Sequence, residues 1–96
     1  MKNNTIEIKF PLGRVVATPD ALEALAATSE TALPYLTRHQ SGDWGTVGAA
    51  DAAENDLSVK EGFRILSAYM LKNGVKIWVI TEADRSSTCI LLPEEY

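Results

Sequence analysis

The sequence predicts a single α+β domain, in which short helices pack on one face of an antiparallel sheet. A chain of 96 residues, 46% of them hydrophobic, is enough for one globular core. Helix signals are concentrated between about residues 18 and 61. The last third carries apolar segments around an Asn-Gly pair, a strong hairpin signal. The expected sheet is therefore a C-terminal three-stranded meander with an added N-terminal strand.

The N-terminal segment has the alternation of a half-buried strand. Ile6, Ile8 and Phe10 alternate with charged residues, which is the period-2 pattern of a strand with one face in a core. Pro11 lacks the N–H that a ladder needs, so the strand is expected at an edge or to break there. Residues 12–18 (LGRVVAT) read as a second extended piece.

The first helix has a clear start signal. Thr18 is a hydroxyl N-cap and Pro19 suits the first helical position. The spacing places Leu22 and Leu25 on the buried face of this helix.

Two further helices are expected before the sheet. The second begins near Ser29 or Thr31, and its apolar residues are Leu33, Tyr35 and Leu36. The third spans about residues 49–61, and Gly62 follows where a left-handed C-terminal cap is wanted.

The hairpin predicts a register and, through it, a dimer. With Asn73-Gly74 as a two-residue turn, Tyr69 faces Trp78 and Ser67 faces Ile80. Both faces of the meander are then apolar, whereas a sheet with one wet face should alternate cleanly. This register predicts a homodimer whose interface includes Tyr69, Trp78 and Ile80.

Composition excludes several functional classes. A net charge of −4 argues against a nucleic-acid binder that works by broad charge attraction. Cys89 is the only cysteine, so the chain has neither a disulfide nor a cysteine zinc site. No phosphate loop, nucleophile elbow or His-containing zinc spacing is present, so no cofactor or metal is expected. Neither a signal peptide nor a membrane span is apparent, which predicts a cytoplasmic location.

The stretch RHQSGDWG, residues 38–45, holds the only histidine of the chain. His39 has the chemistry of a general base, and Asp43 is close enough in sequence to hold its tautomer. The alternative is structural: His39 ends the second helix at its negative dipole end, Asp43 makes an Asx-turn, and Trp44 fills the core.

A second polar cluster follows the second strand of the meander. Glu82, Asp84 and Arg85 precede a run of hydroxyl residues and offer groups for a phosphate or a hard metal ion. The alternative is a strand connection in which Asp84 makes the turn and Arg85 pairs with Glu82. Arg64 or Arg85 beside His39 would complete a minimal set for RNA cleavage.

Four stretches carry a family resemblance: PLGRVVATP, RHQSGDWG, RILSAY and KIWVITEADRSSTCILLPEEY. They resemble a group of small bacterial proteins of unknown function, labelled as plasmid-related or by their restriction-modification neighbours on mobile elements. The resemblance implies a mobile-element or gene-cassette origin and brings no activity with it. The order of a histidine at a helix end, a helix and a curved sheet is also similar to small ribonuclease toxins of the barnase and RelE type.

Two functions follow as expectations. The first is a non-enzymatic protein-interaction module, which the acidic balance and the apolar sheet favour. The alternative is a small metal-independent ribonuclease that uses His39 and Asp43 with Arg64 or Arg85. The surroundings of His39 distinguish the two.

Overall fold

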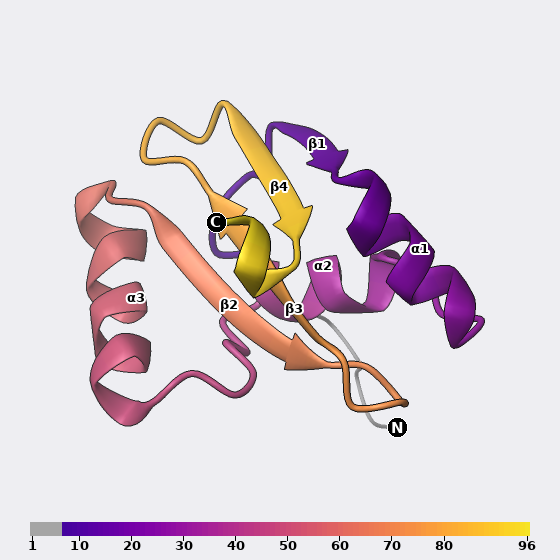
Figure 1. Cartoon of the computed structure of the whole chain (residues 1–96). Helices are drawn as coiled ribbons and strands as arrows, with labels where there is room; N and C mark the ends of the chain where they lie inside the picture. The colour runs from indigo at the N-terminus through magenta and orange to yellow at the C-terminus, as the bar shows by residue number, and fades with distance from the viewer. Residues whose placement is uncertain (1–6) are drawn as a thin grey trace, which may run out of the picture.

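The computed structural model describes residues 7–96, which form an α+β fold, as predicted (Figure 1). The sheet has four strands in the order β1-β4-β3-β2. The elements are β1 Arg14–Ala17, α1 Pro19–Ala27, α2 Leu33–Gln40, α3 Ala49–Glu61, β2 Ile65–Met70, β3 Lys76–Thr81, β4 Ser87–Leu91 and the 3-10 helix η1 Pro93–Glu95.

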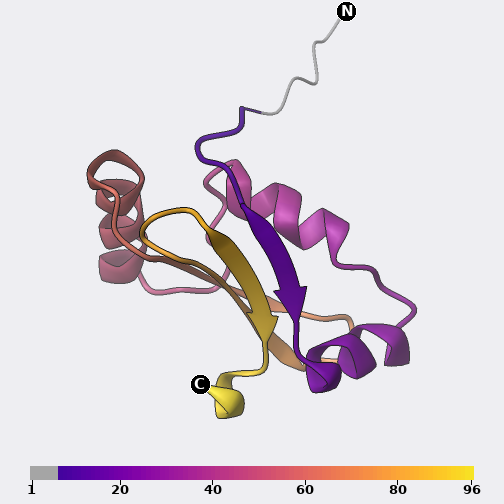
Figure 2. The same ribbon diagram turned by 90° about the horizontal axis from the view of Figure 1, so that it is seen from above.

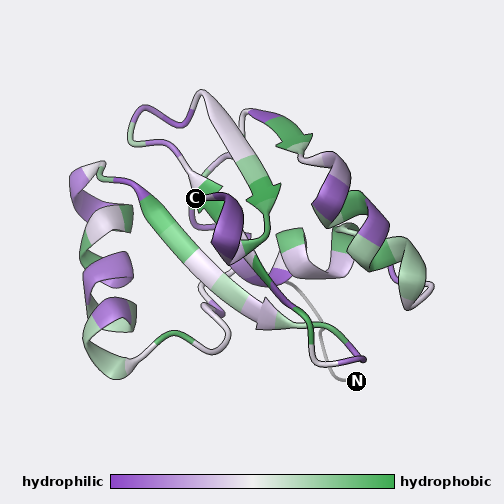
Figure 3. Cartoon of the chain, in the orientation of Figure 1, coloured by the Kyte–Doolittle hydropathy of each residue, from purple (hydrophilic) through white to green (hydrophobic). Residues whose placement is uncertain are grey.

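Helices α1 and α2 cover one face of the sheet, and α3 lies beside its β2 edge. Figure 2 shows α1 and α2 together on one side, whereas α3 stands apart beside β2. η1 lies against β3 on the face away from α2 (Figure 1). Hydrophobic residues concentrate on the strands, and α3 is mostly hydrophilic (Figure 3). We call the face toward α1 and α2 the inner face and the opposite one the outer face.

The signals at Thr18 and Gly62 are confirmed, whereas the second helix begins at Leu33 and not near Ser29 or Thr31. Thr18 Oγ1 accepts a hydrogen bond from the Ala21 N–H at 3.1 Å, and Gly62 caps α3 with a φ of +79°. Both features follow from local chemistry. The placement of Leu22 in the core was wrong, because it is 54% exposed and α1 packs instead through Ala21 and Leu25.

The N-terminal strand differs from expectation in two ways. Ile6 lies outside the described residues, and the segment from 7 to 10 is not a strand, with Ile8 exposed and Phe10 buried. The extended piece predicted at 12–18 becomes β1, which pairs with β4 in parallel. The sheet is therefore mixed, and only β2, β3 and β4 form the antiparallel meander.

The hairpin register was wrong by one residue. Tyr69 pairs with Ile77 and Ala68 pairs with Trp78. The loop has three residues, because the Leu71 N–H donates to Val75 O and the Gly74 N–H donates to Leu71 O, at 2.8 and 2.9 Å. Gly74 has a φ of +87°, as a glycine bulge after a tight turn requires.

The observed register decides which side chains lie on each face of the sheet. The residues on the inner face are fully buried: Ile65, Ser67, Tyr69, Ile77, Val79, Thr81, Thr88 and Ile90. The outer face carries Leu66, Ala68, Met70, Trp78, Ile80 and Leu91. Apolar residues of the meander therefore lie on both faces, as expected, but the residues that share a face differ from those predicted.

The free edge of β2 is covered by this chain itself. The Ala68 N–H donates to Trp44 O and the Thr46 N–H donates to Ala68 O, so residues 44–46 act as a minimal extra strand. Gly45 allows this approach: its φ is +76°, and a Cβ would lie 1.8 Å from Ala68 O. Further along the edge, the Asn55 side-chain amide donates to Leu66 O and accepts from the Leu66 N–H.

Trp44→Ala is expected to destabilise the fold severely. Trp44 is 6% exposed, packs with Phe10 and Ile65, and donates from Nε1 to Asp56 Oδ1 at 3.0 Å. Truncating such a tryptophan costs about 3–5 kcal/mol. Thermal and urea unfolding measure this loss. Phe63→Ala is the control, because Phe63 is 54% exposed; equal effects of the two substitutions would contradict the assigned anchoring role.

Candidate functional site

His39 lies in the last turn of α2, where its ring enters the inner face of the sheet. Its side chain has no exposed surface. Phe10 meets the ring edge-on at 5.2 Å between centroids, and Trp44 does so at 6.0 Å. His39 is thus a core residue, enclosed between a helix, a sheet and two aromatic rings.

Both ring nitrogens of His39 are hydrogen-bonded to strand hydroxyls. Nδ1 lies 2.6 Å from Ser67 Oγ, and Nε2 lies 2.8 Å from Thr81 Oγ1. The hydroxyl of Thr81 lies 2.7 Å from that of Thr88, which donates to Leu12 O at 2.8 Å. A single chain of hydrogen bonds therefore runs from β2 through the imidazole to the segment before β1.

The proton count fixes the direction of this chain. A hydroxyl has one proton to donate, and Thr88 donates its proton to a carbonyl. Thr81 must then donate to Thr88, so it accepts from His39, which places the imidazole proton on Nε2. Ser67 in turn donates to Nδ1. The neutral imidazole satisfies every partner.

The surroundings of His39 disfavour its charged form. Burial lowers the pKa of His39 to about 4, and the positive charge of Arg85 adds to the shift. A general base needs a nitrogen within reach of substrate and a pKa near working pH. His39 has neither feature in this structure.

Asp43 does not reach His39. It pairs with Arg38 instead, with Arg38 Nε 2.7 Å from Asp43 Oδ2, and this contact holds the pKa of the Asp43 carboxyl below its usual range. Asp43 Oδ1 also accepts from the Gly45 N–H at 3.1 Å. This is the Asx-turn of the structural alternative.

Arg85 is committed to backbone carbonyls. Its guanidinium donates to Phe63 O at 2.7 Å and to Ser58 O at 2.8 Å, and so ties the β3–β4 turn to the C-terminal end of α3. It also donates to Glu82 O, whereas the expected pairing with the Glu82 carboxylate does not form. The turn itself follows expectation, since Asp84 Oδ1 accepts from the Ser86 N–H.

Arg64 lies on the outer face and does not join His39. Its guanidinium is 3.2 Å from Glu82 Oε1 and donates to the Tyr96 hydroxyl at 2.7 Å. The structure therefore separates the four residues of the ribonuclease hypothesis: His39 in the core, Asp43 with Arg38, Arg64 outside, and Arg85 on a helix end.

The three predicted interface residues do not share one face of the sheet. Tyr69 is fully buried on the inner face beside Tyr35 and donates to Asp43 O at 2.6 Å. Ile80 is 5% exposed within the chain itself. Only Trp78 stays partly open, on the outer face, with Tyr96 edge-on at 5.5 Å. The observed register moves Tyr69 to the inner face, away from Trp78 and Ile80, so the three residues do not form one exposed surface within this chain.

A groove that the sequence did not reveal opens beside Trp78. It has a volume of about 380 Å³ and lies between α3 and the outer face. Its lining residues are Asp51, Glu54, Asn55, Arg64, Leu66 and Trp78. The acids come from a helix and the tryptophan from a strand, so their proximity depends on tertiary packing alone.

The described part of the chain, residues 7–96, contains no group of three His, Cys, Asp or Glu side chains placed to hold a metal ion. Within the same range, no helix combines the length and apolar character needed to cross a membrane.

Stability should fall with acid in a way that depends on His39. The unfolded chain protonates His39 near pH 6.5, whereas the folded chain does so only near pH 4. The stabilisation from its neutral form is thus complete above pH 6.5 and is lost as the pH falls toward 4, a loss of up to about 3 kcal/mol. Urea unfolding from pH 7 to pH 4 measures it. His39→Gln should be less stable at pH 7 and show a shallower pH slope. Parallel slopes would contradict the role of His39.

Comparison with known proteins gave no relative: no family model matches the chain, and neither do any curated protein or solved structure.

Proposed function

We propose that this chain is a non-enzymatic protein-interaction module of a mobile element, which works as a homodimer in the cytoplasm. The observation that carries the proposal is the enclosure of His39, the one histidine of the sequence, with both ring nitrogens hydrogen-bonded to hydroxyls. An acid–base enzyme needs such a group at its surface. Here the group completes the core.

The ribonuclease hypothesis loses its supporting groups for the same reason. A transition-state cation must be free to meet a phosphate. The guanidinium of Arg85 donates hydrogen bonds to backbone carbonyl oxygens, and Arg64 forms a salt bridge with Glu82. Neither arginine lies with His39 in a groove. Without these three residues as catalytic groups, we expect the surface of the chain to bind a partner.

The two edges of the sheet differ, which supports self-association through β1. The edge of β2 is covered by residues 44–46 and by Asn55. Among residues 7–96, no strand lies on the far side of β1. An uncovered edge offers unpaired N–H and C=O groups to a second strand.

The side chains of β1 fit this role. Val15 and Val16 are 43% and 42% exposed although they point to opposite faces. The Arg14 N–H donates to Ser86 O, just before β4, and the Thr18 N–H donates to Ile90 O in β4, so the peptide groups of Val15 and Ala17 point to the open side. Two copies paired antiparallel along β1 would extend the sheet across a twofold axis and cover these valines.

The absence of catalysis is testable with RNA. We expect the purified protein to leave single-stranded and double-stranded RNA intact at neutral pH, and His39→Gln to behave identically. Gel analysis of labelled RNA is the measurement. Cleavage that disappears in a folded His39→Gln variant would restore the ribonuclease hypothesis, whereas cleavage that persists in that variant indicates a contaminant.

The dimer has a separate test. Sedimentation at micromolar concentration should give twice the mass of one chain, and Val16→Lys should give the mass of one chain by placing a charge on the paired edge. Leu57→Lys is the matched control, because Leu57 is 50% exposed on α3. A wild-type monomer, or a dimer that Val16→Lys leaves intact, would overturn pairing through β1.

A further inference from the structure

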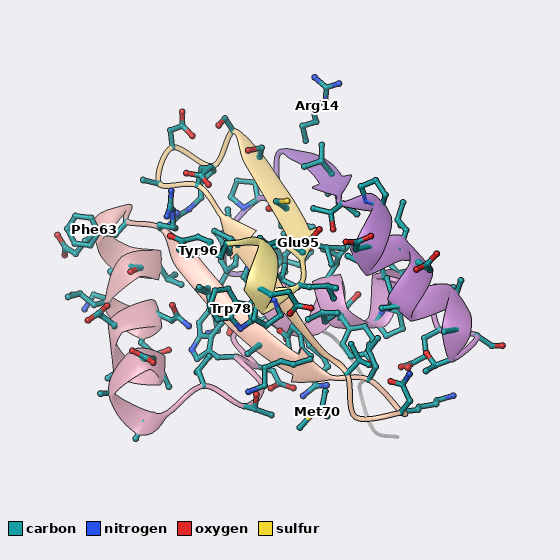
Figure 4. All side chains as sticks on the ribbon, viewed as in Figure 1. Arg14, Phe63, Met70, Trp78, Glu95 and Tyr96 are labelled. Carbon is teal, nitrogen blue, oxygen red and sulfur yellow. The ribbon has the colours of Figure 1, made fainter. Side chains whose placement is uncertain are left out.

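The groove beside Trp78 has one aromatic and one acidic side. Trp78 and Leu66 project from the outer face of β3 and β2, and Figure 4 shows Trp78 directly below Tyr96. Asp51 and Glu54 project from the first turns of α3. An aromatic ring near carboxylates on a concave surface is the arrangement that binds organic cations.

The charges at the groove favour a positive ligand. Asp51 and Glu54 are exposed, and neither forms a salt bridge within residues 7–96. The one cation of the lining, Arg64, is paired with Glu82 and held by the Tyr96 hydroxyl. The carboxylates of Asp51 and Glu54 are therefore not neutralised locally, and the chain as a whole carries a charge of −4.

The uncharged polar side chain in the wall of the groove, Asn55, already has hydrogen-bond partners within the chain. The Asn55 side-chain amide bonds to both the N–H and the C=O of Leu66. It therefore has little capacity to recognise a neutral amide or a hydroxyl. Recognition therefore depends on the indole and the two carboxylates. Together these groups fit the flat cation of an arginine better than they fit any other side chain.

We propose that this groove binds an arginine side chain from a basic segment of a partner protein. The guanidinium lies against the Trp78 indole, and its N–H groups donate to Asp51 and Glu54. The proposal rests on the proposed interaction function and names its partner chemistry. It does not rest on the dimer, because Trp78 is on β3 and the proposed dimer edge is on β1.

The test uses a glycine pentapeptide with one central arginine, acetylated and amidated at its ends, and the same peptide with glutamine as the control ligand. Titration is followed by the ¹H–¹⁵N NMR signals of the Trp78 indole and the Leu66 amide. We expect saturable shifts with the arginine peptide, little change with the glutamine peptide, and weaker binding as salt is raised.

Matched charge variants locate the site. Asp51→Asn with Glu54→Gln should weaken binding by roughly tenfold or more. Glu23→Gln with Glu61→Gln changes the net charge equally at exposed positions outside the groove and should leave binding unchanged. Trp78→Leu, verified as folded by its NMR spectrum, should also weaken binding. Equal loss in both charge pairs would show a general charge effect and overturn the site.

The same titration on Val16→Lys separates the two proposals. Arginine binding that persists in this variant supports the groove whatever the oligomeric state. Shifts absent from the wild type and from Val16→Lys alike would overturn the groove and leave the dimer untouched. Shifts that the glutamine peptide reproduces would overturn the choice of a cationic ligand.

Discussion

The fold depends on one directed chain of hydrogen bonds through a buried imidazole. Ser67, His39, Thr81 and Thr88 each donate a hydrogen bond to the next group, and Leu12 O accepts the last one. Five separate segments are thereby tied together: β2, α2, β3, β4 and the residues before β1. A buried polar network of this kind stabilises a fold only when every member is satisfied, and here every member is.

This chain of hydrogen bonds also constrains the register of the sheet. Side chains alternate between faces, so a slip of one residue in β2 would move Ser67 to the outer face. His39 would then keep a buried nitrogen without a partner, which costs about 1–3 kcal/mol. Apolar residues lie on both faces of the meander, so hydrophobic burial alone discriminates weakly between registers. The hydroxyls supply the discrimination that the apolar pattern lacks.

What the sequence could predict follows from the range of each signal. The bounds of α3 and the cap of α1 depend on neighbours a few residues apart, and they were predictable. The hairpin register was not, because an Asn-Gly pair suits both a two-residue turn and a three-residue loop with a bulge. The parallel direction of β1 depends on its pairing with the last strand, which no local pattern encodes.

The candidate site divides in the same way. The Asx-turn at Asp43 and the burial of Trp44 were both readable from glycine and aspartate spacing. The burial of His39 was not, since its partners Ser67 and Thr81 are 28 and 42 residues away. The groove at Trp78 combines side chains from α3, β2 and β3, so it exists only once those elements have packed.

The pairing of β1 with β4 has a consequence for how the chain is made. Residues 14–17 lie beside residues 87–90, so β1 leaves the ribosome long before its partner strand β4. At about 5–20 residues per second, that interval lasts several seconds. During it, the valines of β1 have no sheet to join and the carbonyl of Leu12 has no hydroxyl to accept from. Cotranslational folding can therefore form helices and the β2–β3 hairpin, but the four-stranded sheet forms only after β4 has left the ribosome.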